Sequence, residues 1–227
     1  MFNDIRGDVT SGSDSLLQAI QKREFKPYIQ PIVCASNHKI IGGELLVRWH
    51  TSHRGVIYPD SFIDNMEKAG ILSELTCSII NEVVVNFDGE NKFNGEDFIL
   101  HVQYFFTVDS KTISTFHCLK ESGVQFALDD FGTGYSNLFY LKYFTVDFIK
   151  VDKMFTQDLE GCKQSRYIIE AILELSRKLN IKTIVEGVET MELVNKLMLL
   201  GVDYFQGYYF GQAIELCSFI REYRKTV

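Results

Sequence analysis

The chain has 227 residues, of which 46% are hydrophobic and 13% aromatic, and this is enough apolar material for one domain with a buried core. Its formal net charge of -7 disfavours broad binding to a phosphate backbone, so we expect a small-molecule partner and no nucleic acid polymer. The five cysteines lack a CxxC pair, which argues against a disulfide framework or a zinc site. The N-terminus has no apolar leader and no stretch reaches the about 18 apolar residues of a membrane span, so we expect a cytoplasmic protein without membrane insertion.

The first half of the chain predicts helices and strands in an irregular order. The expected elements are a helix from Ser13 or Asp14 to about residue 23, strands at 28–33 and 40–49, helices at 59–70 and from Ser73 onward, and a strand at 98–104. Pro31 marks the first strand as an edge or irregular strand, because proline has no N–H to donate to a sheet. The second strand carries Glu44 and Arg48 within an apolar run, and charges in a buried strand require a reason.

The second half alternates regularly between strands and helices. The expected elements are a helix at 110–121, a strand that ends at Asp129 and Asp130, a helix at 138–143, a strand at 148–152, a helix at 163–179, a strand at 182–188, a helix at 191–200, a strand at 203–209 and a last helix from Ile214. This alternation predicts an α/β fold with a parallel sheet.

Polar residues recur at the strand ends of this alternation, about one βα unit apart, at Asp129, Lys150, Glu186 and Gln206. In a β/α barrel such strand ends converge on one site, whereas an open doubly wound sheet would spread them along an edge. We therefore predict a TIM-like β/α barrel. Only seven strands are expected, while a closed barrel of this kind has eight and about 250 residues, so we expect one βα unit to be absent or distorted.

Carboxylates dominate the predicted site, where Glu44 joins Asp129, Asp130 and Glu186. Carboxylates that face a common point repel one another unless a cation lies between them, and hard oxygen donors suit Mg²⁺ or Mn²⁺. The sequence therefore predicts a two-metal site for hydrolysis of a phosphate ester, with Arg48 as a candidate phosphate ligand.

Simpler interpretations stand beside this one. The Asp129-Asp130 pair alone would also suit a helix cap after a strand. Lys150 is compatible with a Schiff-base lysine, although the neighbouring carboxylates would keep its ammonium group charged. His101 suits a hydrogen-bonded core histidine better than a metal ligand.

From about Phe25 onward the chain carries a series of short motifs, which are Tyr28-Ile-Gln-Pro-Ile32, Glu44-Leu-Leu-Val-Arg-Trp49, Asp129-Asp-Phe-Gly-Thr-Gly-Tyr-Ser136, Ile149-Lys-Val-Asp152, Val185-Glu-Gly-Val-Glu-Thr190 and Gln206-Gly-Tyr-Tyr-Phe210. In type and order these motifs resemble those of the EAL-domain cyclic diguanylate phosphodiesterases, with Leu45 in place of the signature alanine. The resemblance implies an EAL-type barrel that uses two Mg²⁺ or Mn²⁺ ions to open one phosphodiester of this bacterial second messenger, which gives linear pGpG.

The resemblance also implies roles for individual residues. Metal ligands would be Glu44, Asp129, Asp130 and Glu186, with His101 as a further candidate; catalytic residues would be Lys150, Glu186 and Glu189; substrate-binding residues would be Gln30, Leu46, Arg48 and Gln206.

The chain departs from the family pattern before Asp129. Only 85 residues separate Glu44 from Asp129, which is shorter than in the family by about 30 residues, or one βα unit. His101 stands where the family has a metal-binding asparagine, or else it aligns with the glutamate of the next strand and the asparagine strand is lost. Either alignment weakens the first metal site. The alternative function is therefore a catalytically inactive EAL domain that acts as a cyclic diguanylate receptor or as a regulator that binds a protein partner.

The expected organisation is a short N-terminal extension with a helix, residues 1–24, followed by one barrel domain, residues 25–227. The extension is too short for a sensor, so we expect no accessory domain within this sequence. Because the family commonly dimerises through elements beside the DDFG loop, a homodimer is a further expectation.

Overall fold

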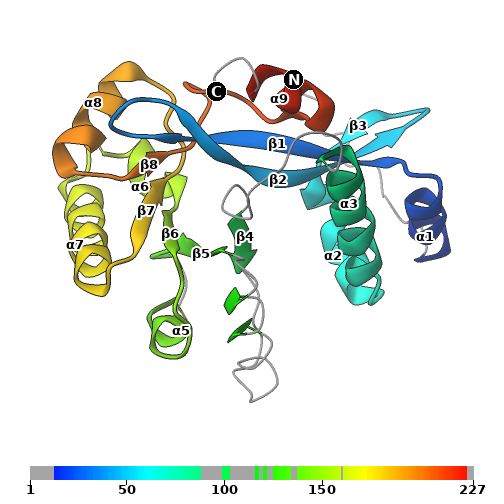
Figure 1. Cartoon of the computed structure of the whole chain (residues 1–227), viewed down its shortest axis with the longest axis horizontal. Coiled ribbons are helices and arrows are strands. Elements are labelled where there is room, and N and C mark those ends of the chain that lie inside the picture. Colours follow the sequence, from blue (N-terminus) through cyan, green and yellow to red (C-terminus); the bar gives the residue numbers. More distant parts are fainter. Residues whose placement is uncertain are drawn as a thin grey trace, which may run out of the picture. The chain divides into compact units, whose positions relative to one another are not determined.

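The computed structural model describes residues 13–87, 99–102, 116–117, 120–121, 125–133, 137–159 and 161–223 (Figure 1). It divides into two compact units. Unit 1 consists of Met1–Ile29, Leu45–Lys92 and Ile214–Glu222, and unit 2 consists of Gln30–Glu44, Phe93–Ala213 and Tyr223–Val227. The strands β1 (Phe25–Cys34) and β2 (Ile40–Thr51) contribute residues to both units. The predicted division into residues 1–24 and 25–227 stays a prediction.

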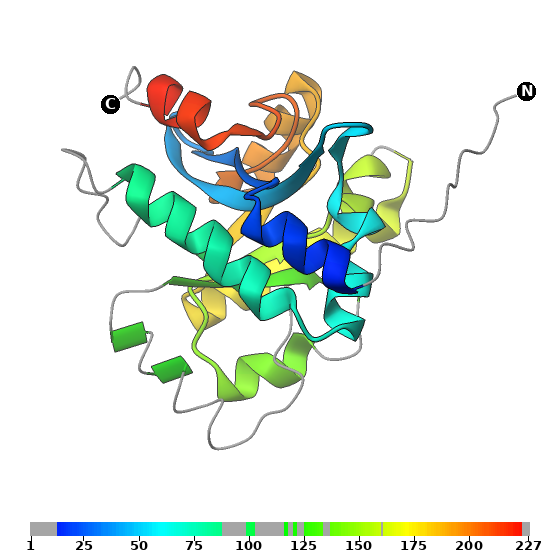
Figure 2. The ribbon, with the colours of Figure 1, turned by 90° about the vertical axis from the view of Figure 1, so that its right-hand side faces the viewer.

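Unit 1 combines helices with short antiparallel strands around an aromatic core. Its elements are α1 (Ser13–Gln21), β3 (Gly55–Ile57), η1 (Pro59–Ser61), α2 (Ile63–Lys68), α3 (Leu72–Phe87), β9 (Ile214–Glu215) and α9 (Leu216–Tyr223). The helices α1 and α3 lie side by side (Figure 2). The rings of Trp49 and Phe62 both pack on Phe25, each with its centroid 5.2 Å away. The aromatic core of unit 1 therefore contains one residue from β1, one from β2 and the residue that precedes α2.

Unit 2 carries the β/α alternation. Its further elements are β4 (Ile99–Val102), β5 (Gln125–Phe131), α5 (Asn137–Tyr143), β6 (Phe148–Val151), α6 (Lys153–Gln157), α7 (Lys163–Leu179), β7 (Lys182–Val185), α8 (Met191–Leu200) and β8 (Tyr204–Phe205). The strands follow the order β2-β1-β8-β7-β6-β5-β4, and α7 packs along β6 and β7 (Figure 1). The pairs from β8 through β4 are parallel, whereas β1 is antiparallel to β8. The predicted parallel sheet therefore has an antiparallel first strand.

The predicted helices with clear end signals are confirmed at their bounds. The helix α7 spans Lys163–Leu179 and ends at Asn180, which adopts the left-handed conformation at φ 55°. The helix α8 spans Met191–Leu200; the Thr190 hydroxyl caps its start and Gly201, at φ 81°, ends it. Local capping chemistry is sufficient to set both helices.

Several strand predictions need correction. The strand expected at 203–209 is only two residues long, because the chain turns at Gly207, where a side chain would collide with the Val188 backbone. The last helix begins at Leu216 instead of Ile214, since Ile214 and Glu215 form a strand that pairs with β1. The hairpin strand β3 was not predicted. The helix predicted at 110–121 lies almost entirely outside the described residues.

No helix in the described part of the chain is long and apolar enough to cross a membrane.

Two aspartates tie the amino ends of the parallel strands. Asp203, just before β8, accepts hydrogen bonds from the Thr183 backbone N–H and hydroxyl at 3.0 Å each and pairs with Lys182 at 2.8 Å. In the same way Asp147, just before β6, accepts a hydrogen bond from the Phe126 backbone N–H at 2.8 Å. Each aspartate therefore fixes the strand that it precedes to the neighbouring strand.

We expect Asp203→Ala to lower the free energy of unfolding by about 2 kcal/mol, because two buried donors of Thr183 lose their acceptor. Urea unfolding followed by circular dichroism measures this change. The control is Glu174→Ala, which removes a carboxylate from an exposed pair with Lys178. Equal losses in the two variants would contradict the role assigned to Asp203.

Candidate active site

The two aspartates at the end of β5 lie in a β-bulge. Leu128 pairs with Ile149 and Phe131 with Val151, so Asp129 and Asp130 together stand opposite the single residue Lys150. In a regular strand neighbouring side chains point to opposite faces. Because of the bulge and the left-handed backbone of Asp130, at φ 49°, Asp129 and Asp130 do not follow this alternation. The Asp130 N–H donates a hydrogen bond to Asp129 Oδ1 at 3.0 Å.

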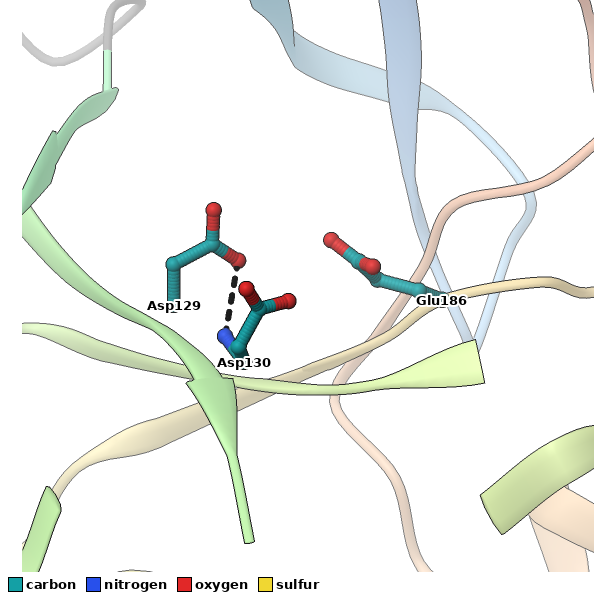
Figure 3. A group of neighbouring side chains, drawn as sticks. All are labelled: Asp129, Asp130 and Glu186. Carbon is teal, nitrogen blue, oxygen red and sulfur yellow. Dashed lines mark hydrogen bonds between the residues drawn. The ribbon is translucent and has the colours of Figure 1, made fainter. Parts of the chain in front are cut away.

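The bulge brings three carboxylates together. Oxygen atoms of Asp129, Asp130 and Glu186 lie within 4.8 Å of one another. Figure 3 shows that Asp129 and Glu186 point toward each other, with Asp130 beneath them. Asp129 belongs to β5 and Glu186 follows β7, and β6 lies between these two strands. A regular strand would not place both aspartates in this group.

The turn after β5 is built for this geometry. The Asp130 carbonyl accepts hydrogen bonds from the Thr133 backbone N–H at 3.1 Å and from its hydroxyl at 2.8 Å. Gly132 has φ +100°, and a Cβ there would lie 2.8 Å from the Phe155 ring. Only glycine suits this position, since both the backbone angle and the available space exclude a side chain.

Lys150 lies at the centre of the carboxylates, with 1% of its side chain exposed. Its ammonium group is 3.0 Å from Asp129 Oδ1 and 3.3 Å from Glu44 Oε1, and it also pairs with Glu186. Burial alone lowers the pKa of Lys150, but the charges of Glu44, Glu186 and Asp129 outweigh it and raise that pKa. The amine therefore stays charged, which disfavours the Schiff-base interpretation.

Glu186 follows β7 and is anchored through its backbone. Its N–H donates to the Val151 carbonyl at 3.0 Å, and its carbonyl accepts the Thr156 hydroxyl at 2.9 Å. Burial raises the pKa of the Glu186 carboxyl, and the charge of Asp129 adds to this while Lys150 opposes it. A carboxylate with a raised pKa is suited to accept a proton.

Gln206 lies in a network of side-chain amides and is only 3% exposed. Its Nε2 donates to Gln30 Oε1 at 3.1 Å and to the Glu44 carboxylate, and Gln30 Nε2 donates to the Gly211 carbonyl at 3.3 Å. Gln206 Oε1 is buried without a hydrogen-bond partner among the residues that the structure describes. A buried acceptor left in this state indicates a donor supplied by a ligand or by bound water.

One cavity of about 440 Å³ collects most of the predicted residues, all within unit 2. Its lining residues are Gln30, Glu44, Asp129, Lys150, Lys153, Gln157, Glu186, Gly187, Glu189, Gln206, Gly207 and Tyr208. Among these, Lys153, Gln157 and Tyr208 were not predicted. The signal for the first two was their spacing of four residues on α6, directly after the Lys150 strand.

Three predicted residues need a separate description. Leu46 and Arg48 belong to unit 1, where the Arg48 guanidinium lies 5.7 Å from the Tyr28 ring centre and 4.6 Å from that of Tyr58. Arg48 also donates to the Val47 carbonyl at 2.8 Å. His101 pairs with Ala127 in the β4–β5 register, but its side chain lies outside the described residues.

A family model described as the EAL domain matches residues 13–104 and 90–213 of the chain. The chain belongs to the EAL domain family. The two matched segments of the EAL model overlap at residues 90–104, which lie between Glu44 and Asp129, the interval in which the sequence predicts the loss of one βα unit.

Solved EAL domains share the architecture. The EAL domain protein from Listeria monocytogenes EGD-e superposes with a TM-score of 0.79 at 27% identity, and the comparison covers 96% of this chain and 100% of that one. The PaMucR phosphodiesterase, solved as a c-di-GMP complex, gives a TM-score of 0.78 at 27% identity, with 90% and 98% covered. The predicted α/β fold of the EAL type is confirmed.

Curated relatives include the cyclic di-GMP phosphodiesterase PdeL of Escherichia coli K12, which is 31% identical over 246 positions that cover 92% of this chain and 68% of PdeL. A probable cyclic di-GMP phosphodiesterase of the same organism, PdeG, is also 31% identical, with 91% and 48% covered. The PdeL alignment is longer than the 227 residues of the whole chain, so PdeL has residues without a counterpart here. This EAL chain spans two thirds of PdeL and about half of PdeG.

We expect Lys150→Met to destabilise the protein by about 3 kcal/mol in EDTA, because three partly buried carboxylates lose their common cation. Mn²⁺ should then raise the melting temperature of the variant more than that of the wild type, since an ion replaces the missing charge.

Lys178→Met serves as the control, because Lys178 forms an exposed pair on α7. If Lys150→Met in EDTA is as stable as this control, the carboxylates do not depend on the ammonium group.

Proposed function

We propose that this EAL chain hydrolyses cyclic diguanylate to pGpG with the help of two divalent metal ions. The observation that carries the proposal is the bulged pair Asp129 and Asp130, whose carboxylates lie close to that of Glu186. Asp129 and Glu186 line one cavity together with the buried Lys150. Membership of the EAL family supports the choice of substrate, as does the similarity to the cyclic di-GMP phosphodiesterase PdeL and to the PaMucR phosphodiesterase solved with c-di-GMP.

The residues present suit a divalent ion. Oxygen atoms of Asp129, Asp130 and Glu186 lie within 4.8 Å of one another, and such hard donors suit a divalent ion. Gln206 Oε1, which is buried without a partner among the described residues, can accept a hydrogen bond from a water molecule bound nearby. We infer that Glu44 and Asp129 would hold one Mg²⁺ or Mn²⁺ ion, and that Asp130 and Glu186, together with Asp129, would hold a second. Such ions supply Lewis acidity, which lowers the pKa of bound water and offsets charge on the phosphate.

The chain's own residues then orient the attacking water and accept its proton. Lys150 stays charged beside Asp129 and Glu186, where its N–H groups can hold the attacking water. Glu186 accepts a proton from that water as the new P–O bond forms and the bond from phosphorus to the 3′ oxygen breaks. The 3′ oxygen takes up a proton, so the products of one water and one cyclic dinucleotide are balanced as pGpG.

The remaining residues take substrate roles in this proposal. Gln206 fixes Glu44 and Gln30 through its amide, so Gln30 presents a positioned side chain to the nucleotide. Glu189 lines the same cavity and supports the metal carboxylates. The roles of Leu46 toward the nucleotide and of Arg48 toward a phosphate stay predictions from the family motif.

A second candidate function rests on the shortened region. The strand β4 pairs directly with β5, and the family model matches residues 90–104 twice. Loss of the unit that supplies the family asparagine would weaken the first metal site, with His101 as the candidate replacement. The alternative is therefore an inactive EAL domain that binds cyclic diguanylate or a protein partner. A cytoplasmic location and a homodimer belong to the proposal in both cases.

We expect purified protein to convert cyclic diguanylate to pGpG in Mn²⁺ or Mg²⁺ and to lose this activity in EDTA. Asp129→Asn should lower kcat by about 1,000-fold or more, because one carboxylate serves both ions. Chromatography of the nucleotides measures the product, and Glu174→Gln is the control for loss of an exposed carboxylate.

If no pGpG forms with the wild type, the enzymatic proposal fails. Calorimetry with cyclic diguanylate then separates the alternatives, since a receptor binds the nucleotide and a protein-interaction module does not.

A further inference from the structure

One wall of the cavity has no role in the reaction proposed above. It is formed by Lys153 and Gln157, which are four residues apart on α6 and therefore lie on one face of that helix. Both side chains are exposed, while the carboxylates of Glu44, Asp129 and Glu186 that line the same cavity are largely buried. Polar side chains with solvent access at the mouth of a cavity are suited to bind a ligand that enters it.

The backbone of α6 is fixed to the Glu186 segment. The Thr156 hydroxyl donates to the Glu186 carbonyl at 2.9 Å, and Asp152 caps the helix by accepting the Met154 N–H at 2.7 Å. Gly187, at φ +67°, packs so closely that a Cβ there would lie 2.5 Å from Lys153 Cβ. These contacts hold Lys153 at a set position relative to the carboxylates.

The two lysines that line the cavity differ in their ion pairing. The lining contains four acidic side chains and two lysines, and Lys150 is enclosed by three of the four acids. Lys153 forms no ion pair with any residue that the structure describes. An unpaired ammonium group at the mouth of an acidic cavity can offset the charge of an anionic ligand without losing a protein partner.

We propose that Lys153 and Gln157 form a phosphate subsite for the part of the substrate that is not cleaved. The inference rests on the proposed function, because a cyclic dinucleotide carries two phosphates and the metal carboxylates would engage only one. Lys153 pairs with the second phosphate, and the Gln157 amide donates a hydrogen bond to it. Both residues are substrate-binding residues and take no part in bond breaking.

Steady-state kinetics of Lys153→Met in Mn²⁺ test this subsite. We expect KM to rise about tenfold with kcat unchanged within about twofold, because a charge-assisted contact is lost from the bound substrate at a distance from the reacting bond. The KM of the variant should also depend less on salt concentration than that of the wild type. Lys153→Arg keeps the charge and should retain most of the wild-type KM.

Further variants separate charge from structure. Gln157→Leu should raise KM less and leave the salt dependence unchanged, since the amide is neutral. Lys178→Met removes a lysine from an exposed pair on α7 and should change neither constant. Melting temperatures of all variants should equal that of the wild type, because the side chains of Lys153 and Gln157 are exposed.

Binding without turnover, measured by calorimetry with Ca²⁺ in place of Mn²⁺, gives an independent readout. We expect the Kd of Lys153→Met for cyclic diguanylate to rise about tenfold as well. If the wild type hydrolyses the nucleotide and Lys153→Met matches it, or loses kcat alone, the subsite is wrong while the proposed function stands. If the wild type binds the nucleotide without hydrolysing it, the proposed hydrolysis fails, and an unchanged Kd of Lys153→Met would show that the subsite is wrong as well. If the wild type does neither, the proposed function and the subsite both fail.

Discussion

The site depends on the ion pairing of one buried lysine. Lys150 brings its ammonium group to Glu44, Asp129 and Glu186, which come from β2, β5 and the end of β7. Burying this charge would be costly without partners, so the three carboxylates stabilise the lysine as much as it stabilises them. One cation among three acids, with Asp130 also within reach of Asp129 and Glu186, leaves an excess of negative charge. That excess is the physical reason to expect divalent ions here.

The surrounding structure holds this charge arrangement in place. The bulge in β5 turns Asp129 and Asp130 toward the same group, and Gly132 lets the chain pass Phe155 directly afterwards. The amino ends of the parallel strands are tied by Asp147 and Asp203, while the functional side chains stand at the other ends. This separation of stability from chemistry is common in β/α folds. It leaves the carboxyl ends available for charged residues that would weaken a core.

The sequence predicted those features that local chemistry determines. The helices α7 and α8 have strong end signals, and the acids at strand ends stand out against apolar runs. The antiparallel direction of β1 depends on pairing with the distant strand β8, which no local pattern encodes. The strand β3 pairs with the neighbouring end of β2, but its three residues are too few to show a strand pattern. The bulge is also a product of register between β5 and β6. Lys153 and Gln157 were missed because their spacing of four residues is a weak signal, and a lysine and a glutamine on a short helix look like ordinary surface residues.

The most direct test of the account is the position of metal ions in crystals grown with Mn²⁺, measured by anomalous diffraction. The account predicts Mn²⁺ bound by Asp129, Asp130 and Glu186, with the Lys150 ammonium group no longer the main partner of all three of its present carboxylates. An absence of anomalous signal at these carboxylates, with Lys150 still paired to Glu44, Asp129 and Glu186 in saturating Mn²⁺, would contradict it.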